Sequence, residues 1–240
     1  MFKIIIYLLI STLFLSTNFA AAQSTINVPK NLYGIPVIGR EDNYLKIIEQ
    51  DEHQKMIQLD KMIPGIILDL RYATTNNFMH RRMYPANTDF TFLRKPAADS
   101  LYKLQQELNS QGLGLKIFDA YRPYSVTQKF WELIHDERYV GNPSKASNHN
   151  RGIAVDLTIV HLKTQEELNM GTGFDNFTDS AHQSFIDFPK DILQNREYLN
   201  ALMEKYGFTP LETEWWHFTL KTKITFDAMD LSFKALKKLE

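Results

Sequence analysis

The eight residues from Ile153 to Val160 are apolar and rich in β-branched side chains, and they contain a single charge, Asp156. This composition predicts a buried strand. Because a buried carboxylate is costly unless a cation or hydrogen-bond donors compensate it, Asp156 needs a partner. A fold that contains this strand must therefore bring another polar or charged group to the middle of its core.

A metal ion is one such partner, and His149 lies seven residues before Asp156. On one straight strand the two residues would lie roughly 23 Å apart and face opposite ways. The chain must therefore double back between them, and residues 150–152 (Asn-Arg-Gly) are turn formers. Two histidines and one carboxylate are a common catalytic zinc set. His217 is a candidate for the second histidine, although spacing alone would equally allow His161 or His182.

The bulk composition excludes several classes of function. A formal net charge of −1 provides no basic field for nucleic acid, so no nucleic-acid partner is expected. The chain has no cysteine, which excludes disulfides, thiolate zinc sites, a cysteine nucleophile and a lipid-modified cysteine anchor. The folded protein must therefore rely on its own core for stability.

The N-terminus has the pattern of a cleavable signal peptide. Lys3 precedes an apolar run from Ile4 to Leu15, and an Ala-Ala-Ala site follows at 20–22. The run is too short for a membrane span, which needs roughly 20 apolar residues. We expect cleavage after Ala22, no membrane anchor after cleavage, and a periplasmic or secreted protein. Residues 23–240 are then expected to form a single domain, with a polar tether at 24–30.

Hydrophobic periodicity and turn residues predict the remaining elements. Strands are expected at 65–72, 113–118, 153–160 and 214–220. Helices are expected from Pro96 to Gly112, after an N-cap at Ser125, at 192–206 and within 226–238. Residues 76–87 and 171–180 are expected to form loops. Because helices and strands do not alternate strictly, the predicted fold is α+β, with a small, mostly antiparallel sheet flanked by helices.

Two motifs occur in order along the chain: Ser-x-His-x6-Asp at 147–156 and Glu-x-Trp-His at 214–217. With these motifs, the region 69–218 resembles the zinc D-alanyl-D-alanine dipeptidases of the vancomycin-resistance type. Those enzymes belong to a wider group of zinc D,D-peptidases that share a fold with the Hedgehog signalling domain. The match is specific because both motifs are present, and no position where the family places chemistry departs from its pattern. The segment before about Pro64 matches only loosely. Further matching segments are Tyr72-Ala73-Thr74, Asn77-Phe78, Asp119-Ala120-Tyr121-Arg122-Pro123, Met170-Gly171-Thr172 and Phe174-Asp175.

The resemblance implies a role for each site residue. It implies one Zn²⁺ per chain, held by His149, Asp156 and His217. Glu214 would be the general base that takes a proton from the attacking water and later protonates the leaving amine. Arg122 would stabilise the tetrahedral oxyanion. Ser147 and Asp175 match residues near the substrate's amino group.

Residue type alone leaves other roles open at several of these positions. Arg122 could equally form a structural salt bridge, and Ser147 could cap a local turn. Asp175 could cap its loop, and Glu214 alone is more often solvated. Trp215 and Trp216 are expected in the core.

The function that the resemblance implies is zinc-dependent hydrolysis of D-alanyl-D-alanine, a small D,D-dipeptide, to free D-alanine in cell-wall peptide turnover. One alternative is a zinc D,D-carboxypeptidase that trims peptidoglycan stem peptides with the same metal set. Asp175 favours the dipeptidase, because an acid there would hold a free ammonium group. The other alternative is a non-catalytic, zinc-stabilised wall-binding module. Glu214 and Arg122 argue against it, because a structural zinc site needs neither.

Overall fold

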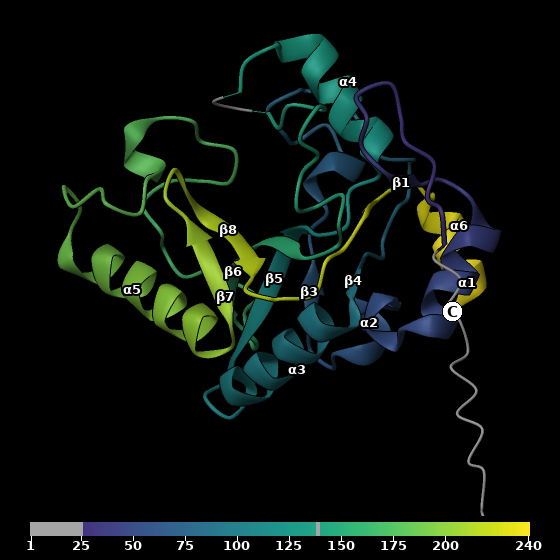
Figure 1. Ribbon diagram of the computed structural model, residues 1–240. Helices are drawn as coiled ribbons and strands as arrows, with labels where there is room; N and C mark the ends of the chain where they lie inside the picture. The colour runs from purple at the N-terminus through teal and green to yellow at the C-terminus, as the bar shows by residue number, and fades with distance from the viewer. Residues whose placement is uncertain (1–25, 138–139) are drawn as a thin grey trace, which may run out of the picture.

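The computed structural model describes residues 26–137 and 140–240, so the expected signal peptide at 1–22 lies outside the described residues. Its centre is a five-stranded sheet in the order β3-β5-β6-β8-β7 (Figure 1). β3 runs parallel to β5, and the other neighbouring strands are antiparallel. The predicted α+β class with a mostly antiparallel sheet is confirmed. The strands are β3 (Ile67–Leu68), β5 (Leu113–Asp119), β6 (Ala154–His161), β7 (Phe208–Leu211) and β8 (Glu214–Leu220).

Helices flank this sheet (Figure 1). α3 (Lys95–Asn109) packs beside β5, and α5 (Lys190–Lys205) packs beside β7. α4 (Tyr124–Ile134) follows β5 directly in the chain and contributes Phe130 to the wall of a cavity of about 380 Å³. The shorter helical elements are α1 (Glu41–Gln50), α2 (Leu59–Met62), α6 (Phe233–Leu239) and the 3₁₀ turns Glu52–Gln54, Arg71–Ala73 and Asp179–Ala181.

Two small two-stranded sheets complete the described fold. β1 (Val37–Ile38) pairs in parallel with β9 (Ala228–Met229), and β2 (Met56–Gln58) pairs antiparallel with β4 (Phe92–Arg94). Met229 N–H donates to the carbonyl of Asn150 at 2.9 Å. The C-terminal part of the chain therefore braces the turn that follows His149. Among the described residues, no helix is both long and apolar enough to cross a bilayer.

The core accounts for the apolar run from Ile153 to Val160. β6 is buried along its length except at its last residue, and Asp156 in its middle is only 3% exposed. Trp215 and Trp216 are also buried, as expected. The loops expected at 76–87 and 171–180 contain neither an α-helix nor a strand.

Three local predictions need correction. Ser125 does not cap a helix, because α4 begins at Tyr124, directly after Pro123, whose fixed φ suits a helix start. Ser125 N–H instead donates to Asp230 Oδ1 at 2.8 Å. Leu133, whose helical spacing from Val126 and Phe130 predicts a place on the same apolar face, is 45% exposed near the end of that helix. The strand expected at 65–72 is reduced to Ile67–Leu68, because the chain then turns into the 3₁₀ segment that buries Tyr72.

The described part of the polar lead, residues 26–30, is more ordered than a tether. Val28 packs against the core, and Lys30 pairs with Pro36. Few apolar residues occur in this segment, which explains why composition predicted a tether.

Candidate active site

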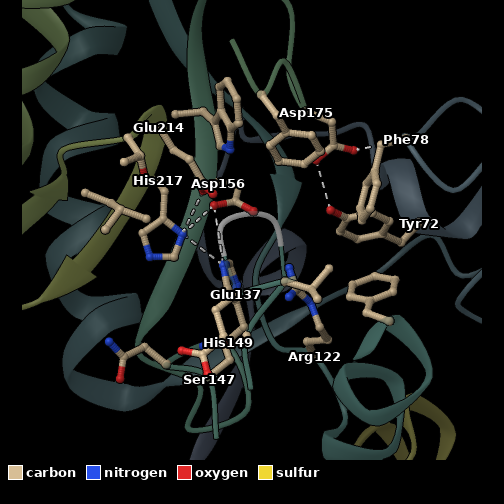
Figure 2. A pocket seen from close by; sticks show the side chains of 18 of the residues that line it. Tyr72, Phe78, Arg122, Glu137, Ser147, His149, Asp156, Asp175, Glu214 and His217 are labelled. Carbon is tan, nitrogen blue, oxygen red and sulfur yellow. Dashed lines mark hydrogen bonds and ion pairs between the residues drawn. The ribbon is translucent and has the colours of Figure 1, made fainter. Parts of the chain in front are cut away.

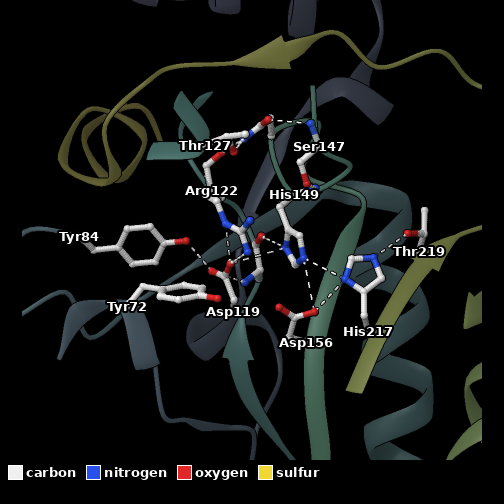
Figure 3. A network of polar contacts seen from close by, with 12 residues as sticks. Tyr72, Tyr84, Asp119, Arg122, Thr127, Ser147, His149, Asp156, His217 and Thr219 are labelled. Atoms are coloured by element: carbon white, nitrogen blue, oxygen red, sulfur yellow. Dashed lines mark hydrogen bonds and ion pairs between the residues drawn. The ribbon is translucent and has the colours of Figure 1, made fainter. Parts of the chain in front are cut away.

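Three side chains that could hold a metal ion converge on one face of the sheet, over β6 and β8. The ligand atoms of His149, Asp156 and His217 all lie within 4.8 Å of one another, and these residues form a candidate metal group among the described residues. His217 Nδ1 lies 2.9 Å from Asp156 Oδ1 and 3.1 Å from His149 Nε2. His149 Nε2 lies 3.4 Å from Asp156 Oδ1. The structure therefore brings together the three residues that the sequence motifs selected (Figure 3).

Strand register produces this convergence. Asp156 on β6 pairs directly with His217 on β8 and with Asp119 at the end of β5. Side chains at paired positions of antiparallel strands lie on the same face, with Cβ atoms only about 4.5–5.5 Å apart. One row across three strands therefore holds two of the candidate ligands and a further carboxylate.

The third candidate ligand reaches the row through the predicted reversal of the chain. The amide of Gly152 donates to the carbonyl of His149 at 3.1 Å, and the amide of Ile153 donates to Asn148 at 3.1 Å. Gly152 has a φ of +72°, a conformation that glycine adopts without steric cost. A side chain at that position would also meet Met56 and Arg94. The turn predicted at 150–152 is confirmed.

Hydrogen bonds fix the orientation of both imidazoles. His149 Nδ1 lies 2.7 Å from the carbonyl of Ala120, and because a carbonyl only accepts, Nδ1 must carry the proton. The unprotonated Nε2 then faces Asp156 and His217, as metal binding requires. His217 Nε2 lies 3.3 Å from Thr219 Oγ1, so its Nδ1 faces inward. Burial tends to raise the pKa of Asp156, but the two imidazoles outweigh it and hold the pKa below its usual value.

Glu214 stands at the start of β8, beside this group. Its Oε2 lies 3.8 Å from His217 Nδ1, which is too far for a fourth member of the cluster but close to the space in front of it. The side chain is 20% exposed and lines the same cavity as His149, Asp156 and His217. Burial, followed by the nearby charge of Asp156, raises the pKa of Glu214, although His217 lowers it in part. A carboxylate with a raised pKa is suited to taking up and releasing a proton.

Arg122 is held by a buried carboxylate that sequence reasoning did not single out. Both Nε and Nη2 of Arg122 donate to Asp119 Oδ2, at 3.0 and 2.6 Å. Asp119 Oδ1 accepts from Tyr84 Oη at 2.5 Å and from the amide of Ala120 at 3.0 Å. Asp119 is fully buried, whereas Arg122 is 8% exposed and lines the cavity. Arg122 can therefore form a structural salt bridge and also act in the cavity, because the salt bridge orients its guanidinium (Figure 3).

Ser147 and Asp175 lie on different sides of the cavity. Ser147 Oγ accepts from the amide of His149 at 3.2 Å, so it caps the local turn while also lining the cavity. Asp175 accepts from Tyr72 Oη at 3.0 Å and from the amide of Phe78 at 3.3 Å (Figure 2). Burial raises the pKa of Asp175 to about 7. Tyr72 is therefore a second residue that motif reasoning left without a role.

The cavity itself has a volume of about 380 Å³. Its floor is the candidate metal group, and aromatic side chains form much of its wall (Figure 2). His161 and His182, the histidines that spacing alone allowed, do not line it. The aromatic residues of the lining are Tyr72, Phe78, Phe130, Phe177 and Trp216.

Comparison with known proteins agrees with this geometry. The family model described as peptidase M15, D-Ala-D-Ala dipeptidase, matches residues 52–234. The chain therefore belongs to this family of metallopeptidases. It is 34% identical over 166 residues to a D-alanyl-D-alanine dipeptidase of Escherichia coli (strain K12), covering 69% of this chain and 84% of that protein. It is 32% identical over 180 residues to a protein of the same name from Enterococcus faecalis (strain ATCC 700802 / V583), covering 68% and 89%.

A solved structure of VanYB in complex with D-alanine-D-alanine is more distantly similar. It is 15% identical, with a TM-score of 0.38, and the alignment covers 63% of this chain and 78% of that chain. This likeness is too weak to support an argument about the site. The assignment to the family rests on the family match and on the two related dipeptidases.

Proposed function

We propose that this protein hydrolyses D-alanyl-D-alanine to free D-alanine, with one zinc ion held by His149, Asp156 and His217. The observation that carries the proposal is the convergence of these three donor atoms on the floor of a small cavity that also contains Glu214 and Arg122. The family and its dipeptidase relatives support the same activity.

The donor atoms fit a zinc ion. Ligands about 2.0–2.1 Å from a tetrahedral zinc lie on the order of 3.3 Å from one another. The donor separations of 2.9, 3.1 and 3.4 Å are close to that value. The set contains two imidazoles and one carboxylate, which leaves a fourth position open, as in catalytic sites. When bound, zinc lowers the pKa of water towards neutrality and polarises a carbonyl group.

Glu214 and Arg122 supply the remaining chemistry. The Glu214 carboxylate accepts a proton from the attacking water and passes it to the nitrogen of the leaving D-alanine. Its raised pKa suits both steps. Arg122, aimed by Asp119, places a fixed positive charge where the oxyanion develops, which is an interaction that often dominates catalysis.

Asp175 supports a dipeptidase rather than a carboxypeptidase. It lies in the cavity wall, where a carboxylate would pair with the free ammonium of a dipeptide. A longer peptide brings an uncharged amide to the same place and leaves the carboxylate buried without a cation. Ser147 lies on the opposite wall and is proposed to contact the substrate there.

We further propose that the protein acts in the periplasm or outside the cell. The basic start, short apolar run and alanine-rich site of residues 1–22 support export. Cleavage after Ala22 would leave a domain at 23–240 without a membrane anchor.

Product analysis tests the proposed function directly. The purified, zinc-loaded protein is incubated with D-Ala-D-Ala and, in parallel, with a pentapeptide stem that ends in D-Ala-D-Ala. We expect free D-alanine from the dipeptide and little or none from the stem. Efficient release of the terminal D-alanine from the stem would instead identify a D,D-carboxypeptidase.

A further inference from the structure

Asp175 lies on a loop that itself contains no strand or α-helix. The segment from Met170 to His182, here called the Met170–His182 loop, contains only a short 3₁₀ turn at Asp179–Ala181. It contributes Asp175 and Phe177 to the cavity wall. Asp175 itself has a φ of +61°, in the left-handed region that Asp adopts more readily than most residues. Because the loop has little regular structure of its own, contacts from outside it help to define its shape.

Arg196, on α5, binds the two ends of this loop. Its Nε donates to the carbonyl of Met170 at 2.7 Å. Its Nη2 donates to Ser180 at 2.8 Å and its Nη1 to His182 at 3.0 Å. Arg196 is only 4% exposed, and its guanidinium lies 4.8 Å from the centre of the Phe188 ring. These three hydrogen bonds all go to backbone oxygens rather than to a carboxylate.

Three carbonyls on one guanidinium close the loop at its base. The planar fork of arginine donates in several fixed directions, so it can hold three acceptors at once, whereas the ammonium of lysine is a single point charge. Compact loops whose ends lie close together are frequently functional. A single side chain can therefore decide whether both ends of the Met170–His182 loop keep their positions.

We propose that Arg196 is a positioning residue that sets the preference for substrates with a free amino group. By joining Met170 to Ser180 and His182, it holds Asp175 over the cavity at the place where a substrate ammonium would lie. The inference rests on the proposed role of Asp175 and adds a residue that does not line the cavity.

Other contacts hold the loop only in part. Trp215 Nε1 donates to Thr172 Oγ1 at 2.8 Å, and Phe174 packs against Phe118 and Trp216. These contacts anchor the first part of the loop and leave its second end, at Ser180 and His182, to Arg196. Removal of Arg196 should therefore loosen the loop and displace Asp175 without unfolding the domain.

Glu214 and the candidate ligands are placed independently of Arg196. They depend on the pairing of β6 with β8 and on the turn after His149. Loss of Arg196 should thus raise KM for the dipeptide more than it lowers kcat, and zinc content should stay unchanged.

Arg94 provides a matched control within the same chain. It is fully buried and, like Arg196, donates to three backbone carbonyls, those of Gln54, Arg151 and Asp227. Arg151 belongs to the turn that carries His149, so Arg94 supports the metal side of the cavity. Arg94→Lys should weaken zinc binding and leave substrate selectivity unchanged.

The experiment compares zinc-loaded wild type, Arg196→Lys, Arg94→Lys and Asp175→Asn. For each protein, kcat and KM are measured on D-Ala-D-Ala, and kcat/KM also on N-acetyl-D-Ala-D-Ala. Arg196→Lys should lower the preference for the free dipeptide by about 10–100-fold, because a displacement of about 1 Å can cost that much. Combined with Asp175→Asn, it should lower the preference no further, within about twofold.

Hydrogen exchange supplies a readout that does not depend on activity. The backbone amides of residues 171–178 should exchange at least about tenfold faster in Arg196→Lys than in wild type. Arg94→Lys should leave them unchanged. If Arg196→Lys does not fold, Asn195→Ala replaces it, since Asn195 donates from the same helix to the carbonyl of Asn169 at 2.9 Å. A smaller change in the same direction is then expected.

Wild-type selectivity and unchanged exchange in the Arg196 variant would overturn the inference. An equal loss of kcat on both substrates would also overturn it, because Arg196 would then act on the catalytic groups. If wild type itself shows no preference for the free dipeptide, the proposed role of Asp175 fails, and the exchange measurement still decides whether Arg196 orders the loop.

Discussion

The candidate metal group and the Met170–His182 loop place their functional side chains by different physical means. Asp156 and His217 are fixed by strand register, in which each backbone bond is repeated along β6 and β8. Asp175 is fixed by a few side-chain contacts to its loop, at Met170, Thr172 and Ser180. Asp156, His217 and Glu214 thus lie on rigid strands, whereas the group proposed for selectivity lies on a loop that can change without disturbing them.

The two regions also shift the pKa of a buried aspartate in opposite directions. Asp156 and Asp175 are both largely buried, and burial raises the pKa of each. Two neighbouring imidazoles reverse the effect at Asp156, so its pKa is lowered. At Asp175 burial outweighs the hydrogen bonds from Tyr72 and the amide of Phe78, and its pKa stays raised, at about 7. The first carboxylate is therefore kept ionised for a metal, and the second titrates near neutrality.

The largest expected effect is at the metal side. His149→Ala, Asp156→Ala and His217→Ala should each lose zinc, and activity should fall with the metal. Loss of a residue that merely supports a ligand costs about 10–100-fold in metal affinity, so loss of a ligand should cost more. Metal analysis of the purified variants measures this directly.

His161→Ala and His182→Ala are the controls for the ligand variants, because neither side chain lines the cavity. Both should retain zinc. Full zinc content in all three ligand variants would refute the proposed site and show that the convergence of donor atoms has another cause.

The next effect separates chemistry from metal binding. Glu214→Gln keeps the size of the side chain but cannot take up the proton, so turnover should fall by about 10²–10⁴-fold with zinc retained. Steady-state rates and metal content measured on the same sample test this. Activity within a few-fold of wild type would place the base elsewhere.

The role of Asp175 on the Met170–His182 loop is tested by comparing substrates with a free and a blocked amino group. Wild type should prefer D-Ala-D-Ala over N-acetyl-D-Ala-D-Ala, because the acetylated amine leaves Asp175 buried and unpaired. Breaking a buried pair costs about 3–5 kcal/mol, which corresponds to on the order of 10²–10³-fold or more in kcat/KM. Asp175→Asn should abolish most of this preference.

Equal kcat/KM values on the two substrates in wild type would favour the carboxypeptidase. A strong preference that survives in Asp175→Asn would keep the dipeptidase but assign the ammonium to another acid. Tyr72→Phe is a matched control, because it removes one donor to Asp175 and keeps the carboxylate. It should change the preference less than Asp175→Asn does.

The sequence predicted the candidate metal group better than it predicted the contacts of the Met170–His182 loop. The seven-residue spacing, Gly152 and the apolar run around Asp156 together required a reversal of the chain, and the structure contains it. The pairing of Asp156 with His217 could not be deduced from periodicity, because register between distant strands depends on the whole fold. Only the motif resemblance selected His217 over His161 and His182.

Side chains that act through other side chains were missed for a different reason. From the sequence alone, Asp119 is an ordinary turn residue. Its contacts with Arg122 and Tyr84 depend on tertiary packing. The sequence did indicate that Arg196 is buried, because it lies four residues after Ile192 and three before Leu199 on one helical face, and both are buried. A charge on the apolar face of a helix indicates a buried partner, as Asp156 did on its strand.

The smallest expected effect is a pH dependence that belongs to the loop alone. A carboxyl group pairs with an ammonium only when ionised, and the pKa of Asp175 is raised to about 7. Below that pH the free enzyme carries a neutral Asp175, so kcat/KM for D-Ala-D-Ala should fall by up to about tenfold per pH unit. The sign follows from the raised pKa: with an ordinary pKa near 3.8, the decline would begin some three units lower.

The control for this pH dependence separates Asp175 from Glu214, whose pKa is also raised. The protonation of Glu214 should affect both substrates alike, whereas an ionised Asp175 favours the dipeptide and disfavours the acetylated substrate. The ratio of the two kcat/KM values, plotted against pH, therefore isolates Asp175, and it should fall as the pH drops through about 7. In Asp175→Asn the ratio should be low and independent of pH. A ratio in wild type that does not change between pH 5 and 8 would mean that Asp175 stays ionised throughout, and the contrast between the two buried aspartates would then be wrong.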